Sequence, residues 1–202
     1  MTKLEAVNEI LEGLGNEAPA TSLDTGGTSV VAEAEVFLDR YSKRIQRDGW
    51  HVNEICEKEY TPDGSGHIDV AANVLKVTPS PYTTVHIRQV GTRIWNATEN
   101  TDVWTDVQKF NIVEELAYTD LPIGLSHYIT AFAAMMFARF KKRSVEDDAF
   151  LRNNVEQAYI EAVRERQDQS AFNMLATSDN RRFHGGRYPN QQYGHNAGYN
   201  YE

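Results

Sequence analysis

Cysteine is almost missing from this 202-residue sequence. Cys56 is the single one, so no disulfide within the chain can support the fold. Such a protein suits a reducing compartment or assembly inside a cell. The longest apolar run, ITAFAAMMFARF, is too short to span a bilayer, and the segment MTKLEAVNEILEGLG does not show the basic-then-apolar pattern of a signal peptide. With 41% hydrophobic residues, the chain is expected to fold around an ordinary buried core.

Basic residues are too few to balance the acids. The chain has 20 Lys and Arg against 29 Asp and Glu, a net charge of −9. Residues 1–175 carry −10, whereas residues 176–202 carry +1. Proteins that hold nucleic acid by its phosphates need clustered Lys and Arg. The composition therefore argues against a body that grips nucleic acid, although nucleic acid could pass it without being bound.

Apolar residues at helical spacing predict two helices before residue 50. The first is expected over residues 3–14 and is stopped by Gly15. The second is expected to begin at Thr28 or Ser29 and to end at Gly49, in the stretch RDGW. A glycine can adopt the left-handed conformation that ends a helix, and an apolar residue behind it can fold back onto the last turns. Trp50 is expected to do so.

Between residues 50 and 119 the helical period disappears. Short runs rich in β-branched and aromatic residues alternate with the turn sequences PDGSG, TPSP and ENTD, which predicts a small antiparallel β module. The runs HIRQV and RIWNAT, separated by GT, are expected to form a hairpin.

Helical spacing returns after residue 119. Asp120 is expected to cap a third helix with Pro122 in its first turn, and the apolar character of residues 122–142 on almost every side predicts burial against several partners. Ser144 and Asp147 resemble a capping box that starts a fourth helix, expected to end near Gln169. We therefore expect an α+β fold: a four-helix bundle from residues 1–49 and 120–175, a small antiparallel β module inserted between helices 2 and 3 (50–119), and an extended C-terminal tail (176–202).

Several short motifs have both a chemical and a structural interpretation, and the structural one is favoured. The DTG at Asp24 is similar to an aspartic-protease loop, but no apolar strand precedes it. The GSGHID stretch has too few glycines for a dinucleotide loop and is expected to be a turn. His67, His86 and Asp69 could meet on neighbouring strands, but a metal site needs three or four converging ligands. The sequence predicts no catalytic residue, no metal and no cofactor.

Other single residues are interpreted as packing groups. Cys56 is expected to be a buried thiol, and His127 and Tyr128 are expected to pack at the start of the third helix. The three tryptophans Trp50, Trp95 and Trp104 could stack on sugars, but they are expected to fill a small β core.

The C-terminal segment 176–202 is rich in Gly, Asn, Gln and Tyr and has too few aliphatic residues to form a core alone. Its stretch NRRFHGGRY interleaves arginines with aromatic residues. That pattern is typical of protein interfaces, and also of single-stranded nucleic-acid binders. We favour protein docking over disorder and over nucleic-acid binding. The residues expected to bind are Arg181, Arg182, Phe183, Arg187 and Tyr188.

The order of six segments resembles a known family. AVNEILEGLG is followed by a loop ending in TSLD, then by RIQRDGW, by a β region, by a DLP helix and by an acidic helix that runs into FNML. Over residues 4–175 this order resembles tail tubular protein A of T7-like podophages, the head-to-tail adaptor. The resemblance does not cover the last 27 residues.

The resemblance implies a structural role without catalysis in the tail of a virion assembled in the host cytoplasm. It implies a homo-oligomeric ring of twelve copies between the portal protein and the tail nozzle (tail tubular protein B), with tail fibres attached nearby. DNA passes through the lumen of such a ring without specific binding, which agrees with an acidic body. No membrane partner is implied. The alternative function is a tail component that binds or degrades polysaccharide.

Overall fold

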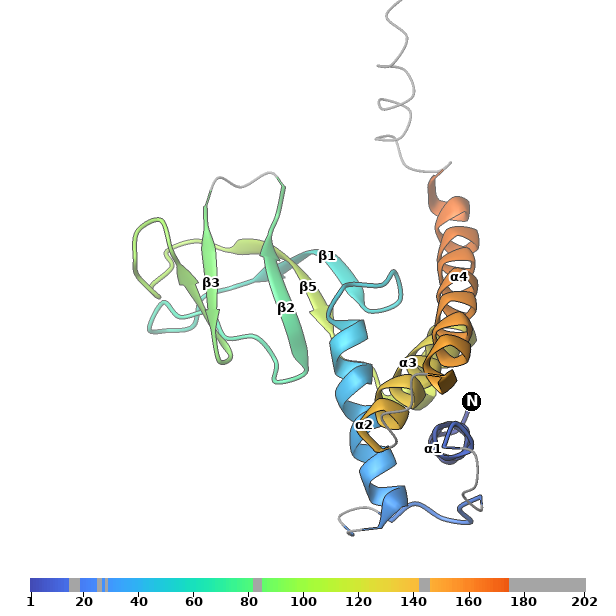
Figure 1. The fold of residues 1–202 in the computed structure, drawn as a ribbon. Coiled ribbons are helices and arrows are strands. Elements are labelled where there is room, and N and C mark those ends of the chain that lie inside the picture. The colour runs from blue at the N-terminus through green and yellow to red at the C-terminus, as the bar shows by residue number, and fades with distance from the viewer. Residues whose placement is uncertain (15–18, 25–26, 28, 82–84, 142–145, 175–202) are drawn as a thin grey trace, which may run out of the picture. The chain divides into compact units, whose positions relative to one another are not determined.

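The computed structural model describes residues 1–14, 19–24, 27, 29–81, 85–141 and 146–174. The described chain is a mixed α+β protein (Figure 1). Its helices are α1 (Lys3–Glu12), α2 (Val30–Gln46), α3 (Ile123–Lys141) and α4 (Glu146–Met174). Its strands, all between α2 and α3, are β1 (Glu54–Tyr60), β2 (Val74–Pro79), β3 (Ile87–Val90), β4 (Arg93–Asn96) and β5 (Gln108–Glu114). The chain divides into two compact units, residues 1–166 and 167–202.

Side-chain caps fix where the first two helices begin. The Thr2 hydroxyl accepts from the Glu5 N–H while the Glu5 carboxylate accepts from the Thr2 N–H, which is a capping box. Ser29 caps α2 by accepting from the Ala32 N–H, which confirms one of the two expected starts. α1 already ends at Glu12, and the expected stop at Gly15 lies outside the described residues.

The third and fourth helices differ from the expected boundaries. α3 begins at Ile123, because the residue before Pro122 is kept out of the helical conformation: Leu121 is extended, and Tyr118–Asp120 form a separate 3-10 turn. The expected cap at Asp120 is therefore wrong. α4 continues past Gln169 to Met174, since its sequence contains neither glycine nor proline. The expected cap at Ser144 lies outside the described residues.

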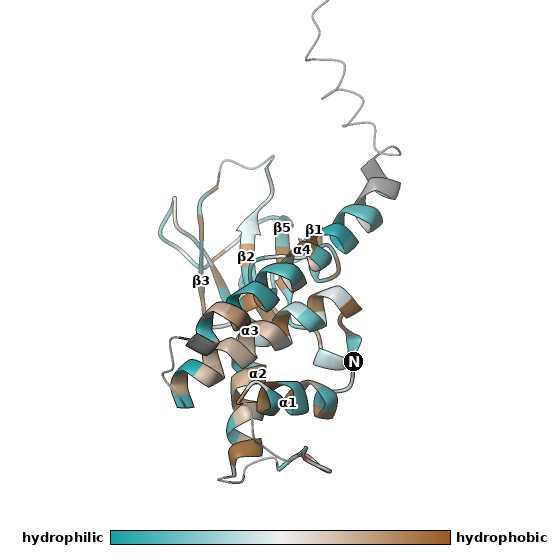
Figure 2. Cartoon of the chain, turned by 45° about the vertical axis from the view of Figure 1, so that its right-hand side comes forward, coloured by the Kyte–Doolittle hydropathy of each residue, from teal (hydrophilic) through white to brown (hydrophobic). Residues whose placement is uncertain are grey.

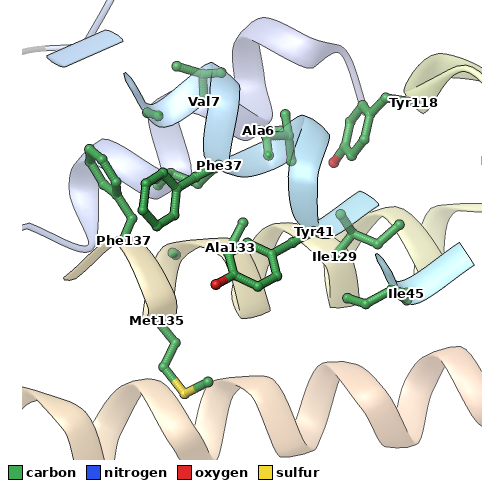
Figure 3. Packing of buried hydrophobic residues seen from close by; sticks show 14 of the residues in the cluster. Ala6, Val7, Phe37, Tyr41, Ile45, Tyr118, Ile129, Ala133, Met135 and Phe137 are labelled. Carbon is green, nitrogen blue, oxygen red and sulfur yellow. The ribbon is translucent and has the colours of Figure 1, made fainter. Parts of the chain in front are cut away.

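The larger hydrophobic core is built around α3, as its apolar sequence predicts. α1 and α2 both pack on it: Phe37 of α2 meets Phe137 of α3 edge to face, with ring centroids 5.1 Å apart. In Figure 3, Met135 points from α3 toward α4, and Figure 2 shows α3 largely apolar where α4 is largely hydrophilic. α4 contributes fewer residues to this core, mainly Leu151 and Ala162.

The strands form two antiparallel sheets around a second, smaller core. The order is β1-β5-β2 in one sheet and β3-β4 in the other. β3 and β4 form the expected hairpin, and Gly91 at its turn has a positive φ of 63°. Trp104 and Phe110 lie in the core, edge to face at 5.9 Å, and the Trp104 indole donates to the Ile94 carbonyl at 2.9 Å.

The RDGW stretch ends α2 as the sequence predicts. Gly49 has a φ of 85°, and its N–H donates to the Gln46 carbonyl at 3.1 Å. Trp50 then folds back: its indole N–H donates to the Ile45 carbonyl at 3.0 Å, and its ring is buried in the larger core beside Tyr128. The chain therefore leaves the helix through a fixed turn.

Two buried carboxamides tie the end of α2 to the strands, and sequence analysis did not single them out. The Gln46 side chain bonds both the N–H and the carbonyl of Leu116, at 2.8 and 3.1 Å. The Asn53 side chain accepts from the Trp50 N–H and donates to the carbonyls of Gln46 and Glu114. Both side chains are almost fully buried. The entry to the strand region and the exit from it are thus held side by side.

Tyr118 forms a second buried polar contact in the larger core. Its hydroxyl lies 2.6 Å from the Thr130 hydroxyl and donates to the Ser126 carbonyl at 3.1 Å. Burial raises the pKa of Tyr118 from 10.0 to about 12.

Stability is therefore expected to fall at high pH through Tyr118. Because the unfolded chain loses this phenol proton near pH 10 and the folded chain near pH 12, the contribution is complete below pH 10 and is lost as the pH rises to 12. Two pKa units correspond to about 2–3 kcal/mol. Urea unfolding between pH 9 and 12 should show this loss, and Tyr118→Phe should reduce the slope. Equal slopes for both proteins would contradict it.

Candidate assembly surfaces

The residues expected to bind a partner, Arg181, Arg182, Phe183, Arg187 and Tyr188, all lie outside the described residues. Their predicted role stays a prediction.

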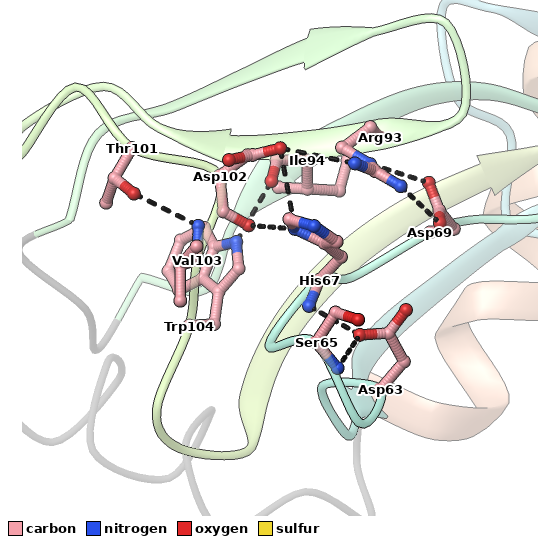
Figure 4. A network of polar contacts seen from close by, with 10 residues as sticks. All are labelled: Asp63, Ser65, His67, Asp69, Arg93, Ile94, Thr101, Asp102, Val103 and Trp104. Carbon is pink, nitrogen blue, oxygen red and sulfur yellow. Dashed lines mark hydrogen bonds and ion pairs between the residues drawn. The ribbon is translucent and has the colours of Figure 1, made fainter.

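In the strand region, the His67 side chain contacts the loop at Asp102 and does not form a metal-ligand cluster with Asp69 and His86. His67 Nδ1 lies 3.2 Å from the Asp102 carbonyl and 3.4 Å from its carboxylate, while Asp69 pairs with Arg93 (Figure 4). His86 directly precedes β3, and its side chain is exposed. No three His, Cys, Asp or Glu side chains within the described ranges come together as metal ligands.

The GSGHID stretch is a turn, as expected. The Asp63 carboxylate accepts the N–H groups of Ser65 and His67, each at 2.8 Å, which holds the pKa of Asp63 below its usual value. Gly66 takes a positive φ of 82°, and the space beside it is filled by Val103 and Trp104. The network in Figure 4 therefore fixes loops around the β3-β4 hairpin.

The three tryptophans have different environments. Trp104 fills the strand core, as expected, but Trp50 belongs to the helical core. Trp95 is half-buried, with the Arg88 guanidinium 5.2 Å from its ring centre. Two of the three rings are thus unavailable for stacking on a sugar, which removes most of the support for polysaccharide binding.

The expectation that Cys56 is buried is wrong, because its side chain is exposed on β1. β1 is an edge strand, and its register against β5 shifts between Ile55 and Lys58, where Glu57 has a positive φ of 54°. Partial desolvation and the neighbouring Glu54 and Glu57 raise the pKa of the thiol. A thiol of this kind is a weak nucleophile at neutral pH.

α4 is held against α3 at a few defined points. The missing side chain of Gly124 brings the backbone of Ala162 within 3.2 Å of the position a Cβ would take, and the Gly124 N–H donates to Glu165 at 2.8 Å. At the other end of α3, Arg139 pairs with Asp148 and lowers the pKa of that carboxylate. Because contacts are few, α4 leaves open grooves beside it.

The larger groove, of about 520 Å³, lies between α1, α3 and α4. Its lining includes Glu9, Glu12, His127 and the exposed ring of Phe150. His127 was expected only to pack at the start of α3, but its side chain also lines this groove. A second groove of about 420 Å³, beside Tyr128 and Tyr159, lies between α3 and α4. Exposed apolar surfaces of this kind are typical of proteins that contact other proteins.

Charged side chains form a row on each of two helices. Glu5, Glu9 and Glu12 are exposed on α1, and Arg40, Arg44 and Arg47 are exposed along α2 and its C-terminal cap. Partial burial raises the pKa of Glu9, and the charges of Glu12 and Glu5 raise it further, against the effect of His127. No ion pair between described residues involves any of these six side chains. The ion pairs that α1 and α2 do form use Lys3, Glu33, Glu35, Asp39 and Lys43.

Comparison with known proteins places the chain in a family of structural proteins. Residues 4–182 match the Tail tubular protein family, so the chain belongs to that family, whose members are components of the phage tail in the virion. The match extends beyond residue 175, where the resemblance was expected to end, and includes Arg181 and Arg182. No curated protein matches the chain. Within the described ranges, every helix is too short or too polar to cross a membrane.

Proposed function

We propose that the protein is a head-to-tail adaptor that forms a ring, of twelve copies, between the portal protein and the tail nozzle (tail tubular protein B). In this role it conducts DNA, helps to attach tail fibres and performs no catalysis. The observation that carries the proposal is membership of the Tail tubular protein family over residues 4–182. The exposed grooves beside α4 support it, because a ring subunit needs lateral contacts.

In the proposed ring the four helices (1–49 and 120–175) act as one bundle, and the strand region (50–119) is a module inserted between α2 and α3. The buried side chains of Gln46 and Asn53 support a fixed arrangement of the two, since they bond backbone on both sides of the junction. A fixed junction would let every copy present the same surfaces to its neighbours.

DNA passes through the proposed lumen without specific binding. The charge of −10 on residues 1–175 supports this, because a conduit with an acidic wall repels the phosphates that move past it. The same charge requires that contacts between copies place the available cations against acidic side chains.

Residues 176–202 form the proposed anchor to the portal, through Arg181, Arg182, Phe183, Arg187 and Tyr188. Arginines and aromatic rings supply forked hydrogen bonds and rigid contact area, and they are the residue types that dominate protein interfaces. The support comes from composition: this segment carries +1, unlike the acidic body.

The mass of the assembled protein tests the proposal. The purified full-length chain is expected to add twelve copies to isolated portal rings, measured by native mass spectrometry or by particle reconstruction. Alone it can stay monomeric, because ring closure can require the portal as a template. A different symmetry on the portal, or no binding to the portal, would show that the proposal is wrong.

A further inference from the structure

We infer that the glutamate row on α1 (Glu5, Glu9, Glu12) and the arginine row on α2 (Arg40, Arg44, Arg47) are the two halves of the contact between neighbouring copies of this chain. The inference rests on the proposed ring and names the surfaces that would close it.

The spacing of the two rows matches. Each row occupies positions i, i+4 and i+7, so its three side chains share one face and span about 10 Å along the helix. Arg47 is the C-cap of α2 and continues that face. Both helices use their opposite faces to pack in the core, through Val7 and Ile10 of α1 and through Leu38 and Tyr41 of α2. The rows therefore point outward from one subunit, with opposite signs.

Each row lies beside exposed apolar surface. Glu9 and Glu12 border the 520 Å³ groove that contains Phe150, whose side chain is 67% exposed. On α2, Val36 precedes the arginine row by one turn and is 54% exposed. Phe140 of α3, 61% exposed, contacts the Phe37 ring on which Arg40 also lies. Each surface thus combines a charged row with an exposed aromatic ring, Phe150 beside the glutamate row and Phe140 beside the arginine row.

The charges favour a second copy as the occupant. A body with a net charge of −10 repels its copies unless unpaired arginines meet unpaired acids at the contact. The pKa of Glu9 is raised by its burial and by the charges of Glu12 and Glu5, so a facing row of arginines would stabilise the ionised form of Glu9. A surface of each sign on one chain suits a head-to-tail contact, and such contacts form a ring when the rotation between successive copies closes.

Charge reversal tests the inference, because two oppositely reversed variants should restore the contact when they are mixed. One variant carries Glu9→Lys and Glu12→Lys, and the other carries Arg40→Glu and Arg44→Glu; Glu5 is left unchanged because it caps α1. Each variant alone is expected to assemble on portal rings at least tenfold less well than the unchanged chain. An equimolar mixture of the two restores opposite charges at every contact when they alternate, and twelve is an even number. The mixture is therefore expected to recover assembly to within about threefold, and so is a single chain with all four changes.

The matched control reverses two exposed acids of α4, with Glu161→Lys and Asp168→Lys, and is expected to assemble normally. Circular dichroism and thermal melts of each variant show whether it folds, and rescue by mixing excludes misfolding as the cause.

A crosslink gives a second measurement: with Cys56→Ser, the pair Glu12→Cys and Arg44→Cys should be joined by a short bismaleimide between copies.

The outcomes separate this inference from the proposed function. If the unchanged chain forms rings and both reversed variants form them equally well, the inference is wrong and the adaptor function stands. If the unchanged chain forms no ring on the portal, the adaptor function is wrong, and the inference is wrong with it. If Arg40→Glu with Arg44→Glu reduces only binding to duplex DNA and leaves the rings intact, the arginine row contacts DNA, which also overturns the inference.

Discussion

Replacing Asn53 with alanine is expected to lower the free energy of unfolding by about 2–4 kcal/mol. Its carboxamide accepts from the Trp50 N–H at 2.8 Å and donates to the carbonyls of Gln46 and Glu114 at 3.0 and 2.9 Å. The side chain is 2% exposed, so water cannot replace these bonds without entering the core. A buried polar group left without a partner costs about 1–3 kcal/mol. The Gln46 carbonyl keeps its bond from Gly49, so the Trp50 N–H carries most of the loss.

Gln46→Ala should have an effect of similar size, because it removes both bonds to the backbone of Leu116 and one to the Ser42 hydroxyl. The matched controls are Asn73→Ala and Gln157→Ala, both at exposed positions, which should change the free energy by less than about 0.5 kcal/mol. Urea unfolding followed by circular dichroism and by tryptophan fluorescence gives the comparison. If Asn53→Ala unfolds at the same urea concentration as its control, these bonds do not stabilise the junction.

The parts of the fold that sequence analysis predicted correctly depend on local signals. Gly49 with Trp50, the Ser29 cap and the turn at Gly91 are each determined by residues within a few positions, so a pattern in the sequence is sufficient to find them. The apolar α3 was also recognised, because a helix that is apolar on most sides requires partners on most sides.

The features that were missed depend on residues far apart in the chain. Gln46 is a polar residue on the buried face of α2, and its partner Leu116 lies 70 positions away. The buried hydroxyl of Tyr118 likewise bonds to Thr130, which lies 12 positions further along the chain. Cys56 was expected to be buried because its type usually is, yet the shifted register of an edge strand exposes it. The residue type alone does not predict that register shift.

The two charged rows were predictable only in part from the sequence. Their spacing is visible in the sequence, since Glu5, Glu9 and Glu12 and the three arginines from Arg40 follow the helical period. What the sequence could not show is that neither row has an ion-pair partner among the described residues. Lys3, the basic residue of α1, pairs with Glu35 and Asp39 of α2 and not with the glutamate row. The packing of α1 beside α2 determines which charged side chains form ion pairs within the subunit.

Truncation of the chain after Ser178 is expected to leave the folded body intact and to reduce assembly on the portal by more than tenfold. Among the described residues, the larger core draws its members from positions 1 to 162, so the truncation removes none of them. The removed segment includes all five proposed portal-binding residues and the net positive charge of the C-terminal region. The circular dichroism spectrum should change only by the contribution of the lost residues, and the urea midpoint should stay the same.

The size of the effect follows from the cost of ordering the segment. Fixing the backbone of each residue costs about 1–2 kcal/mol, so a segment of this length binds only if many side chains contact the portal and twelve copies bind together. Cosedimentation with portal rings measures the loss. A full-length chain with Arg181→Ala, Arg182→Ala and Phe183→Ala separates these side chains from the length of the segment, and it should lose most of the same binding. If the truncated chain joins the portal as well as the full chain does, the anchor is not in residues 179–202, and the portal contact must be carried by the helices themselves.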